Sequence, residues 1–188
     1  MNEQINRVVS SFKYDGEPYS VLPHGSGHIN STFKVECKNG DKTKRYILQR
    51  INSNIFPDTD ALTENIENVT EFLKEKITKR GGDVLRETLN LVSTVEGKNY
   101  YTDKKSEKWR SYLFIEDTVC YEKIENPKDF YNCGYAFGKF QNQLADFPAE
   151  KLHEVIPNFH NTPMRYETFK KAVSADICGR AKSVRKEI

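Results

Sequence analysis

A turn with two glycines between two strand-like stretches is the feature that most constrains the fold of this chain. Gly25 and Gly27 follow an apolar stretch that ends at Pro23, and a strand-like composition returns at Thr32. Glycine permits positive φ and has no Cβ, so the backbone amides of such a turn can approach a ligand closely. Amides that point the same way bind phosphate oxygens. An ordinary hairpin turn is the alternative, because glycine is also a default turn residue.

Composition narrows the class of protein. The chain has 188 residues, of which 37% are hydrophobic and 30% charged. Its net charge is +2, and the sequence has no long run of residues of one charge. This balance predicts a globular protein and argues against general nucleic-acid binding, which needs a clustered basic face. No apolar stretch has the length or flanks of a signal peptide or a membrane span, so we expect no membrane partner. The four cysteines form no C-x-x-C pair, which favours reduced thiols and a cytoplasmic location.

The first 117 residues predict an antiparallel sheet with one long helix. Asn39-Gly40-Asp41 is a strong hairpin signal, and apolar residues spaced by three and four after Pro57 predict one buried helix face. The wholly apolar end of the last strand predicts burial on both of its faces. The expected elements are a helix within 1–13, strands 19–23, 32–36 and 45–51, a helix from 57 to Gly81-Gly82, and strands 89–95, 99–103 and 108–116.

Residues 118–188 predict helices only. Prolines and capping residues indicate helices at 127–146 and from Thr162, and a further helix is expected over 175–188. Gly134 and Gly138 would let another backbone pack closely. We expect the chain to self-associate through residues 127–175, because an uncovered apolar patch usually finds a partner. The aromatic residues expected to stay partly uncovered are Phe130, Phe137, Phe140 and Phe169.

The order of these elements selects among the known phosphate-binding designs. No Gly-Lys-Ser/Thr follows the turn, so a P-loop is excluded, and the turn joins two strands, so a dinucleotide fingerprint is excluded as well. A glycine turn above the phosphates with a helix carboxylate behind the third strand is the arrangement of protein kinases. Glu67, beside the apolar stripe of the long helix, is the candidate carboxylate. A solvated surface glutamate is the alternative.

Five segments, in order, resemble the superfamily of aminoglycoside phosphotransferases and choline kinases, and most of all the N-acetylhexosamine 1-kinases. The segments are 24–33, 46–50, 65–70, 114–119 and 159–163. The resemblance implies an α+β fold: a protein-kinase-like N-lobe over 1–117 that binds the nucleotide, then a hinge and the first helices of an incomplete helical C-lobe over 118–188. It also implies ATP and Mg2+ as cofactors. The acceptor would be the anomeric hydroxyl of an amino sugar such as N-acetylglucosamine or N-acetylgalactosamine.

The resemblance also assigns roles to single residues. His28 would reach the sugar, and Glu67 would be the helix carboxylate. Gln49 falls where the wider superfamily has a basic residue, although the hexosamine kinases share a glutamine there. The backbone of 114–117 would be the hinge that meets adenine, with core packing as the alternative for the side chains of Phe114 and Tyr112. The positions assigned to the nucleotide are Gly25, Ser26, Gly27, Ile29, Asn30, Gln49, Glu67, Phe114 and Glu116.

The residues that transfer phosphate in the resembled superfamily have no match. Its His-x-Asp-x-x-x-x-Asn loop is not found, since neither His153 nor His160 has an aspartate two residues later. We therefore expect no catalytic residue and no metal ligand in this chain, which would stop before the active site and be inactive alone. Two alternatives stay open. One is a freestanding nucleotide- or partner-binding module, and the other a kinase of an aminoglycoside, choline or homoserine.

Overall fold

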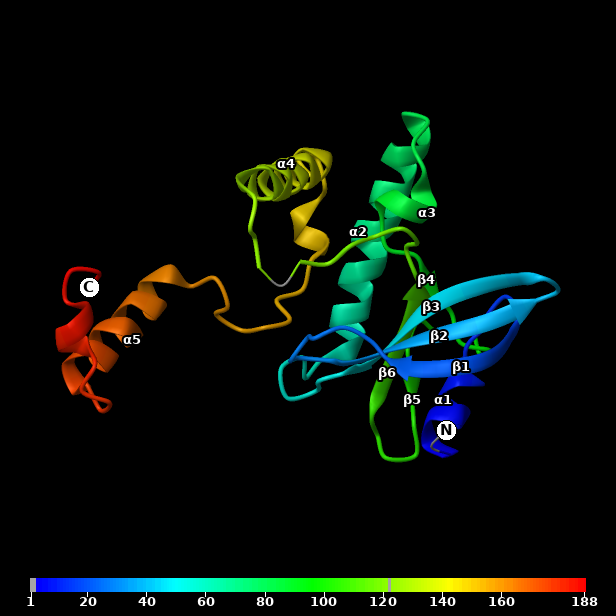
Figure 1. Ribbon diagram of the computed structural model, residues 1–188, viewed down its shortest axis with the longest axis horizontal. Helices are drawn as coiled ribbons and strands as arrows, with labels where there is room; N and C mark the ends of the chain where they lie inside the picture. The colour runs from blue at the N-terminus through cyan, green and yellow to red at the C-terminus, as the bar shows by residue number, and fades with distance from the viewer. Residues whose placement is uncertain (1–2, 122) are drawn as a thin grey trace. The chain divides into compact units, whose positions relative to one another are not determined.

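The computed structural model describes residues 3–121 and 123–188, which group into two compact units, Met1–Val155 and Ile156–Ile188. The first unit is α+β and contains a six-stranded antiparallel sheet (Figure 1). The second unit contains a helix and a short helical turn. The predicted boundary after residue 117 separates the two lobes of a kinase and not these two units, and it stays a prediction.

The sheet is built on a meander of three strands, as the sequence predicted. Strands β1 (Glu17–Pro23), β2 (Ser31–Asn39) and β3 (Lys42–Ile51) pair in succession, and the β2–β3 turn has Gly40 at φ +59°. Strand β6 (Lys108–Leu113) pairs with β3 on the far side. The order is β1-β2-β3-β6-β4, and β5 also pairs with β6.

Two predicted strands are much shorter than expected. Only Leu91–Val92 (β4) and Tyr101–Thr102 (β5) pair with β6, in place of 89–95 and 99–103. The backbone between them turns back on itself, because the Thr94 amide donates to the Lys98 carbonyl at 2.7 Å. The Thr94 hydroxyl also accepts from the Lys98 amide, at 3.0 Å, so a side chain takes a backbone donor that a longer ladder would need.

The end of β6 also differs from the prediction. The strand stops at Leu113 rather than at Glu116, and the residues that follow are half-buried instead of enclosed on both faces. The Phe114 amide still donates to the Arg45 carbonyl, at 3.1 Å, and the chain then leaves the sheet through Asp117 at φ +55°. The backbone groups of residues 114–117 therefore lie beyond the end of β6, outside its ladder with β3.

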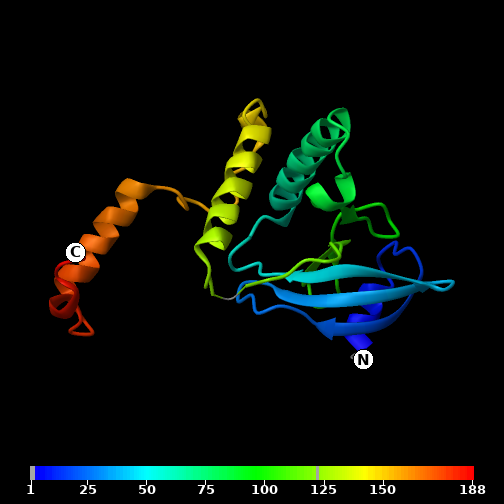
Figure 2. The ribbon, with the colours of Figure 1, turned by 45° about the horizontal axis from the view of Figure 1, so that its top comes forward.

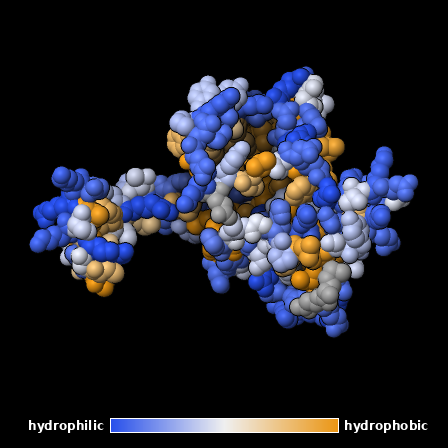
Figure 3. Space-filling model, viewed as in Figure 1, coloured by the Kyte–Doolittle hydropathy of each residue, from blue (hydrophilic) through white to orange (hydrophobic). Residues whose placement is uncertain are grey.

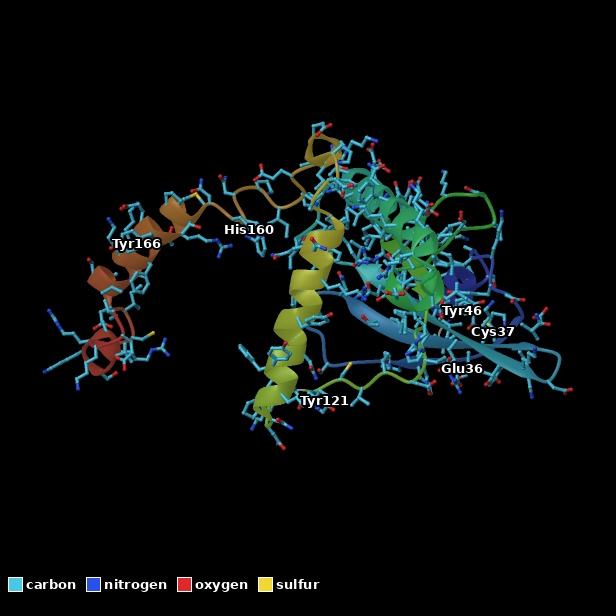
Figure 4. The ribbon with its side chains drawn as sticks, turned by 90° about the horizontal axis from the view of Figure 1, so that it is seen from above. Glu36, Cys37, Tyr46, Tyr121, His160 and Tyr166 are labelled. Atoms are coloured by element: carbon cyan, nitrogen blue, oxygen red, sulfur yellow. The ribbon has the colours of Figure 1, made fainter. Side chains whose placement is uncertain are left out.

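The two faces of the sheet have different roles. Helix α1 (Glu3–Val9) covers one face, and helix α2 lies on the other (Figure 2). The α1 face is an apolar core, in which Cys37 and Tyr46 of neighbouring strands are labelled in Figure 4. Burial raises the pKa of the Cys37 thiol to about 11. The part of this face under α1 is therefore filled, and the α2 face carries further polar side chains of β2, β3 and β6. The buried members of the core are Val8, Val9, Phe12, Val35, Cys37, Tyr46, Leu48 and Trp109.

Helix α2 (Thr59–Lys79) matches its prediction at both ends. The Asp58 side chain accepts a hydrogen bond from the Ala61 amide, and Gly81 follows the helix at φ +73°. Leu73 and Ile77 are buried on the face that packs inward. A one-turn helix, α3 (Val84–Glu87), follows and was not predicted.

Helix α4 (Pro127–Gln143) was also predicted, although it has no buried residue. It is held to α2 at its C-terminal end. Lys76 donates to the carbonyl of Gln143, the last residue of α4, at 2.8 Å, and Phe147, beyond the helix, packs edge-on against Phe72 with ring centroids 5.2 Å apart. A short 3-10 turn, η1 (Ala149–Lys151), comes next. Few contacts therefore hold α4, and its own side chains stay exposed.

In the second unit, one predicted helix is confirmed and one is wrong. Helix α5 (Thr162–Ala175) begins where Thr162 was predicted to open it, with the Asn161 side chain accepting from the Met164 amide. The predicted helix over 175–188 is instead a 3-10 turn, η2 (Ala181–Val184). Asp176 ends α5 in the left-handed conformation, at φ +36°, and its carboxylate then accepts from the Ala181 amide. That turn prevents the helix from continuing.

We predict that Asp103 is a main stabilising residue of the first unit. Its carboxylate accepts from Gln4 at 2.6 Å and from the indole of the core residue Trp109 at 3.2 Å. Burial alone would raise the pKa of Asp103, but these bonds and those from two backbone amides outweigh it and lower the pKa. Asp103→Ala should cost about 2–3 kcal/mol of unfolding free energy, measured by urea unfolding at pH 7.

The pH dependence follows from that lowered pKa. The stabilisation by Asp103 is present above the ordinary aspartate pKa of about 3.9 and is lost as the pH falls through the folded-state value. The difference between wild type and Asp103→Ala should therefore shrink in acid. Glu75→Ala, on the exposed side of α2, is the control and should stay within about 0.5 kcal/mol of wild type. Equal effects of the two substitutions would contradict the prediction.

We predict that the exposed aromatic face of α4 associates with a second copy of the chain. Phe130 and Phe137 are 68% and 65% exposed, and a Cβ placed at Gly134 or Gly138 would meet no atom within 4 Å. A patch of this kind is more stable when covered. Light scattering over a concentration series should show a rising mean mass, and Phe137→Lys should suppress the rise.

Asn142→Lys adds the same charge elsewhere on α4 and is the control for this substitution. It should leave the association unchanged. A monomer at high micromolar concentration that also binds no dye for apolar surfaces would show that the association does not occur.

Candidate functional site

The glycine turn joins β1 to β2 and is fastened at its base. The His24 amide donates to the Thr32 carbonyl at 2.9 Å, and the Asn30 side chain accepts from the Asn52 amide at 3.0 Å. Gly25 has φ +77°, a conformation that favours glycine, whereas Gly27 does not have positive φ. Neither glycine has an atom within 4 Å of an added Cβ. The turn is therefore open to solvent between two fixed ends.

The residues of the turn with predicted roles are spread around it. His28, the predicted sugar-binding residue, and the neighbouring Ser26 are exposed, and Ile29 is 53% exposed. Asn30 is half-buried because its amide anchors the turn. The exposed residues are free to contact a ligand, while Asn30 already has a structural role. Their predicted roles stay predictions.

The predicted hinge lies beside the glycine turn. The ring of Phe114, directly after β6, meets the ring of His24 edge-on, with centroids 5.6 Å apart and planes at 71°. This contact brings together two segments that are far apart in the sequence. A ligand could therefore touch the turn amides and the backbone after β6 at the same time.

Both ends of Glu116 are already bound. Its carboxylate pairs with Arg45 at 3.0 Å, and its backbone carbonyl accepts from the guanidinium of Arg86 at 2.9 Å. Arg45 also pairs with Glu36 at 3.2 Å, which lowers the pKa of Glu36. The adenine ring of a nucleotide could therefore bond the carbonyl of Glu116 only by displacing Arg86.

Glu67 is on α2, as predicted, and its partner is a loop residue. Its carboxylate accepts from the Asn99 amide at 2.5 Å, and Asn99 in turn accepts from the Ser93 hydroxyl at 3.0 Å. This chain of hydrogen bonds ties α2 to the loop between β4 and β5. The half-buried carboxylate thus differs from the freely solvated glutamate that was the alternative.

Gln49, on β3, lies between Thr32 of β2 and Arg110 of β6. Its amide nitrogen donates to the Thr32 hydroxyl at 3.1 Å, and its amide oxygen accepts from Nε and Nη2 of Arg110 at 3.1 and 3.0 Å. The antiparallel register pairs Gln49 with each of these residues, so all three side chains share the α2 face. Among residues 3–121 and 123–188, no aspartate or glutamate forms an ion pair with Arg110.

Desolvation lowers the pKa of the Arg110 guanidinium, and the nearby Tyr112 phenol acts weakly in the opposite direction. Nothing in the sequence alone marks Arg110 as a functional residue. Strand alternation over 108–113 places it on the same face as Tyr112, and this was the available signal. The missing information was the register, which alone places Arg110 opposite Gln49.

A cavity of about 460 Å3 adjoins the turn on the other face of the sheet. It contains Arg50, whose guanidinium pairs with Glu107 at 2.7 Å and donates to the Ser31 hydroxyl at 3.0 Å. Arg50 is therefore neutralised by a carboxylate, in contrast with Arg110 on the α2 face.

Two further cavities border α2. One of about 470 Å3 lies between α2 and the 97–100 loop and includes Glu67. The other, of about 410 Å3, is mostly apolar and lies between α2 and Phe140 of α4. Figure 3 shows apolar surface in the hollow beside these helices. Neither cavity contains a residue of the glycine turn.

A scan against models of protein families gives no match. Within the described part of the chain, no three histidine, cysteine, aspartate or glutamate side chains gather as they would around a metal ion. In the same residues, no helix has both the length and the apolar character needed to cross a membrane.

We predict that Asn30 fixes the glycine turn through its side-chain oxygen. Asn30→Ala removes the acceptor of the Asn52 amide, so amide hydrogen exchange in residues 24–31 should accelerate. Asn30→Asp keeps an acceptor oxygen of the same reach and should leave exchange close to wild type. Equal exchange in the alanine variant and wild type would show that the bond does not hold the turn.

Proposed function

We propose that residues 1–117 form the nucleotide-binding lobe of an ATP-dependent small-molecule kinase with a protein-kinase-like N-lobe. The observation that carries this proposal is the contact between His24 and Phe114, which sets the open glycine turn beside the backbone that follows β6. Kinases cover the phosphates with a glycine turn between two strands. The acceptor we propose is the anomeric hydroxyl of an N-acetylhexosamine, with His28 as the contact to the sugar.

The residues present suit ATP. The exposed amides of the turn are donors for phosphate oxygens, and the half-buried Phe114 offers an apolar edge for a base. When bound, ATP would supply the phosphoryl group. The chain's own part is to bind the nucleotide and to orient its phosphates along the turn.

Magnesium is not matched by the carboxylates near this site. Glu67 is bound to Asn99, and Glu116 is paired with Arg45. We therefore assign neither carboxylate to Mg2+, and the proposal concerns nucleotide binding without a metal step. Kinases of this kind work where ATP is abundant, and a cytoplasmic location agrees with the four free cysteines of this chain.

A second candidate is a binding module that holds a partner protein in place of a nucleotide. The hydrogen bond from Arg86 to the Glu116 carbonyl favours this second candidate, because adenine would need that carbonyl as an acceptor and Arg86 already occupies it. The two candidates differ in one measurement, the binding of adenosine and ATP.

We predict weak ATP binding that depends on the glycine turn. Calorimetry should give a dissociation constant in the millimolar range, which corresponds to roughly 4 kcal/mol. Gly27→Val should weaken binding several-fold, because the added methyl groups would occupy the space of the phosphates. Gly27 has no positive φ, so this substitution adds no backbone strain.

Gly134→Val makes the same change in α4, away from the turn, and is the matched control. It should leave ATP binding unchanged. If wild type binds ATP and Gly27→Val binds it equally well, the turn is only a connection between strands. If wild type binds neither ATP nor adenosine, the module that binds a protein becomes the better proposal.

A further inference from the structure

Arg110 is a half-buried guanidinium without a carboxylate partner among the described residues. A guanidinium is charged at any physiological pH, and a charge held away from water is costly unless it is paired. Arg110 is half-buried, and desolvation lowers its pKa. Nevertheless its partner is the neutral amide of Gln49. Within residues 3–121 and 123–188 no carboxylate neutralises it, although five other ion pairs form on or beside β2, β3 and β6.

Gln49 orients the guanidinium without cancelling its charge. The amide oxygen accepts two bonds from Arg110, and the amide nitrogen is bound to Thr32, which fixes the direction of the amide. These bonds use Nε and Nη2. Nη1 of Arg110 makes no hydrogen bond to a described residue. It also faces space that solvent can reach, because no fully buried side-chain nitrogen in this part of the chain lacks a partner.

We propose that Arg110, positioned by Gln49, is a binding site for the polyphosphate chain of the ligand. A guanidinium forms strong, charge-assisted bonds with phosphate oxygens, and an arginine without a carboxylate keeps its full charge for them. The site lies on β6, the strand that pairs with β3, which carries Gln49. The inference deepens the proposed nucleotide binding and rests on it for the identity of the ligand.

The opposite face of the sheet offers the competing site. Arg50 is the next residue after Gln49 and borders the cavity of about 460 Å3 beside the turn. Its charge is already balanced by Glu107 at 2.7 Å, and Ser31 accepts a second bond from it. A phosphate would have to compete with that carboxylate. Arg110 has no such competitor among the described residues, so the α2 face is the one we assign.

Titration of the full chain with inorganic tripolyphosphate tests the site without any contribution from the base. Isothermal calorimetry should show binding to wild type. Arg110→Gln should weaken it by about 10- to 100-fold, the size expected for a charge-assisted hydrogen bond. Arg50→Gln removes the same charge on the opposite face and is the matched control, for which a change below about 2-fold is expected because its charge is already paired.

A second variant separates loss of the site from loss of the fold. Gln49→Glu preserves the size of the side chain and gives Arg110 a carboxylate partner. It should weaken tripolyphosphate binding as strongly as Arg110→Gln, while the melting temperature stays at or above that of wild type. A destabilised protein could not produce this pair of results.

The outcomes are distinct for the site and for the proposed function. Loss of tripolyphosphate binding in Arg110→Gln and Gln49→Glu, with Arg50→Gln unaffected, supports the site whether or not adenosine binds. Unchanged binding in Arg110→Gln, loss only in Arg50→Gln, or no binding to wild type overturns it. ATP binding that persists in Arg110→Gln at wild-type affinity leaves the proposed function standing without this site. Tripolyphosphate binding without any ATP binding supports the Arg110 site and contradicts the proposed function.

Discussion

The register between β2, β3 and β6 is the constraint on which the rest of the structure depends. It pairs Gln49 with Thr32 on one side and with Arg110 on the other, and it places Leu48 on the opposite face in the core. A slip of one residue would exchange the two faces, because strand side chains alternate. The polar group and the apolar core are thus fixed by the same set of backbone hydrogen bonds.

The packing of α1 explains why ligand chemistry is left to one face. Val8 and Val9 of α1 close the face that contains Tyr46 and Trp109, and burial raises the pKa of the enclosed Tyr14 phenol. The part of this face that α1 covers offers no room to a polar ligand, and Arg50, which borders the cavity at the end of the face, is already paired with Glu107. Helix α2 leaves the polar residues of the other face only half-buried. An arginine there can keep its charge at moderate cost, because solvent still reaches part of it.

The sequence predicted the elements whose signals are local. The hairpin at Gly40 and the ends of α2 depend on residues within one turn of the chain, and all were found. The predictions failed where short side chains compete for backbone groups. Thr94 bonds the amide of Lys98 and shortens two strands, and Asp176 ends α5 and prevents the expected last helix. The place of Glu67 on the long helix was predicted, whereas its partner was not, because the partner depends on the path of the loop that contains Asn99.

The role of Gln49 depends on Arg110, its neighbour on the next strand. Taken alone in the sequence, it replaces a cation with a neutral side chain and so weakens the case for phosphate binding. In the structure it accepts two bonds from a cation on the next strand, and the positive charge of that face is moved rather than lost. A lysine at 49 would repel Arg110, and a glutamate would neutralise it. A neutral acceptor at position 49 is what lets Arg110 be ordered and still attract an anion, so the two residues should be considered as one unit.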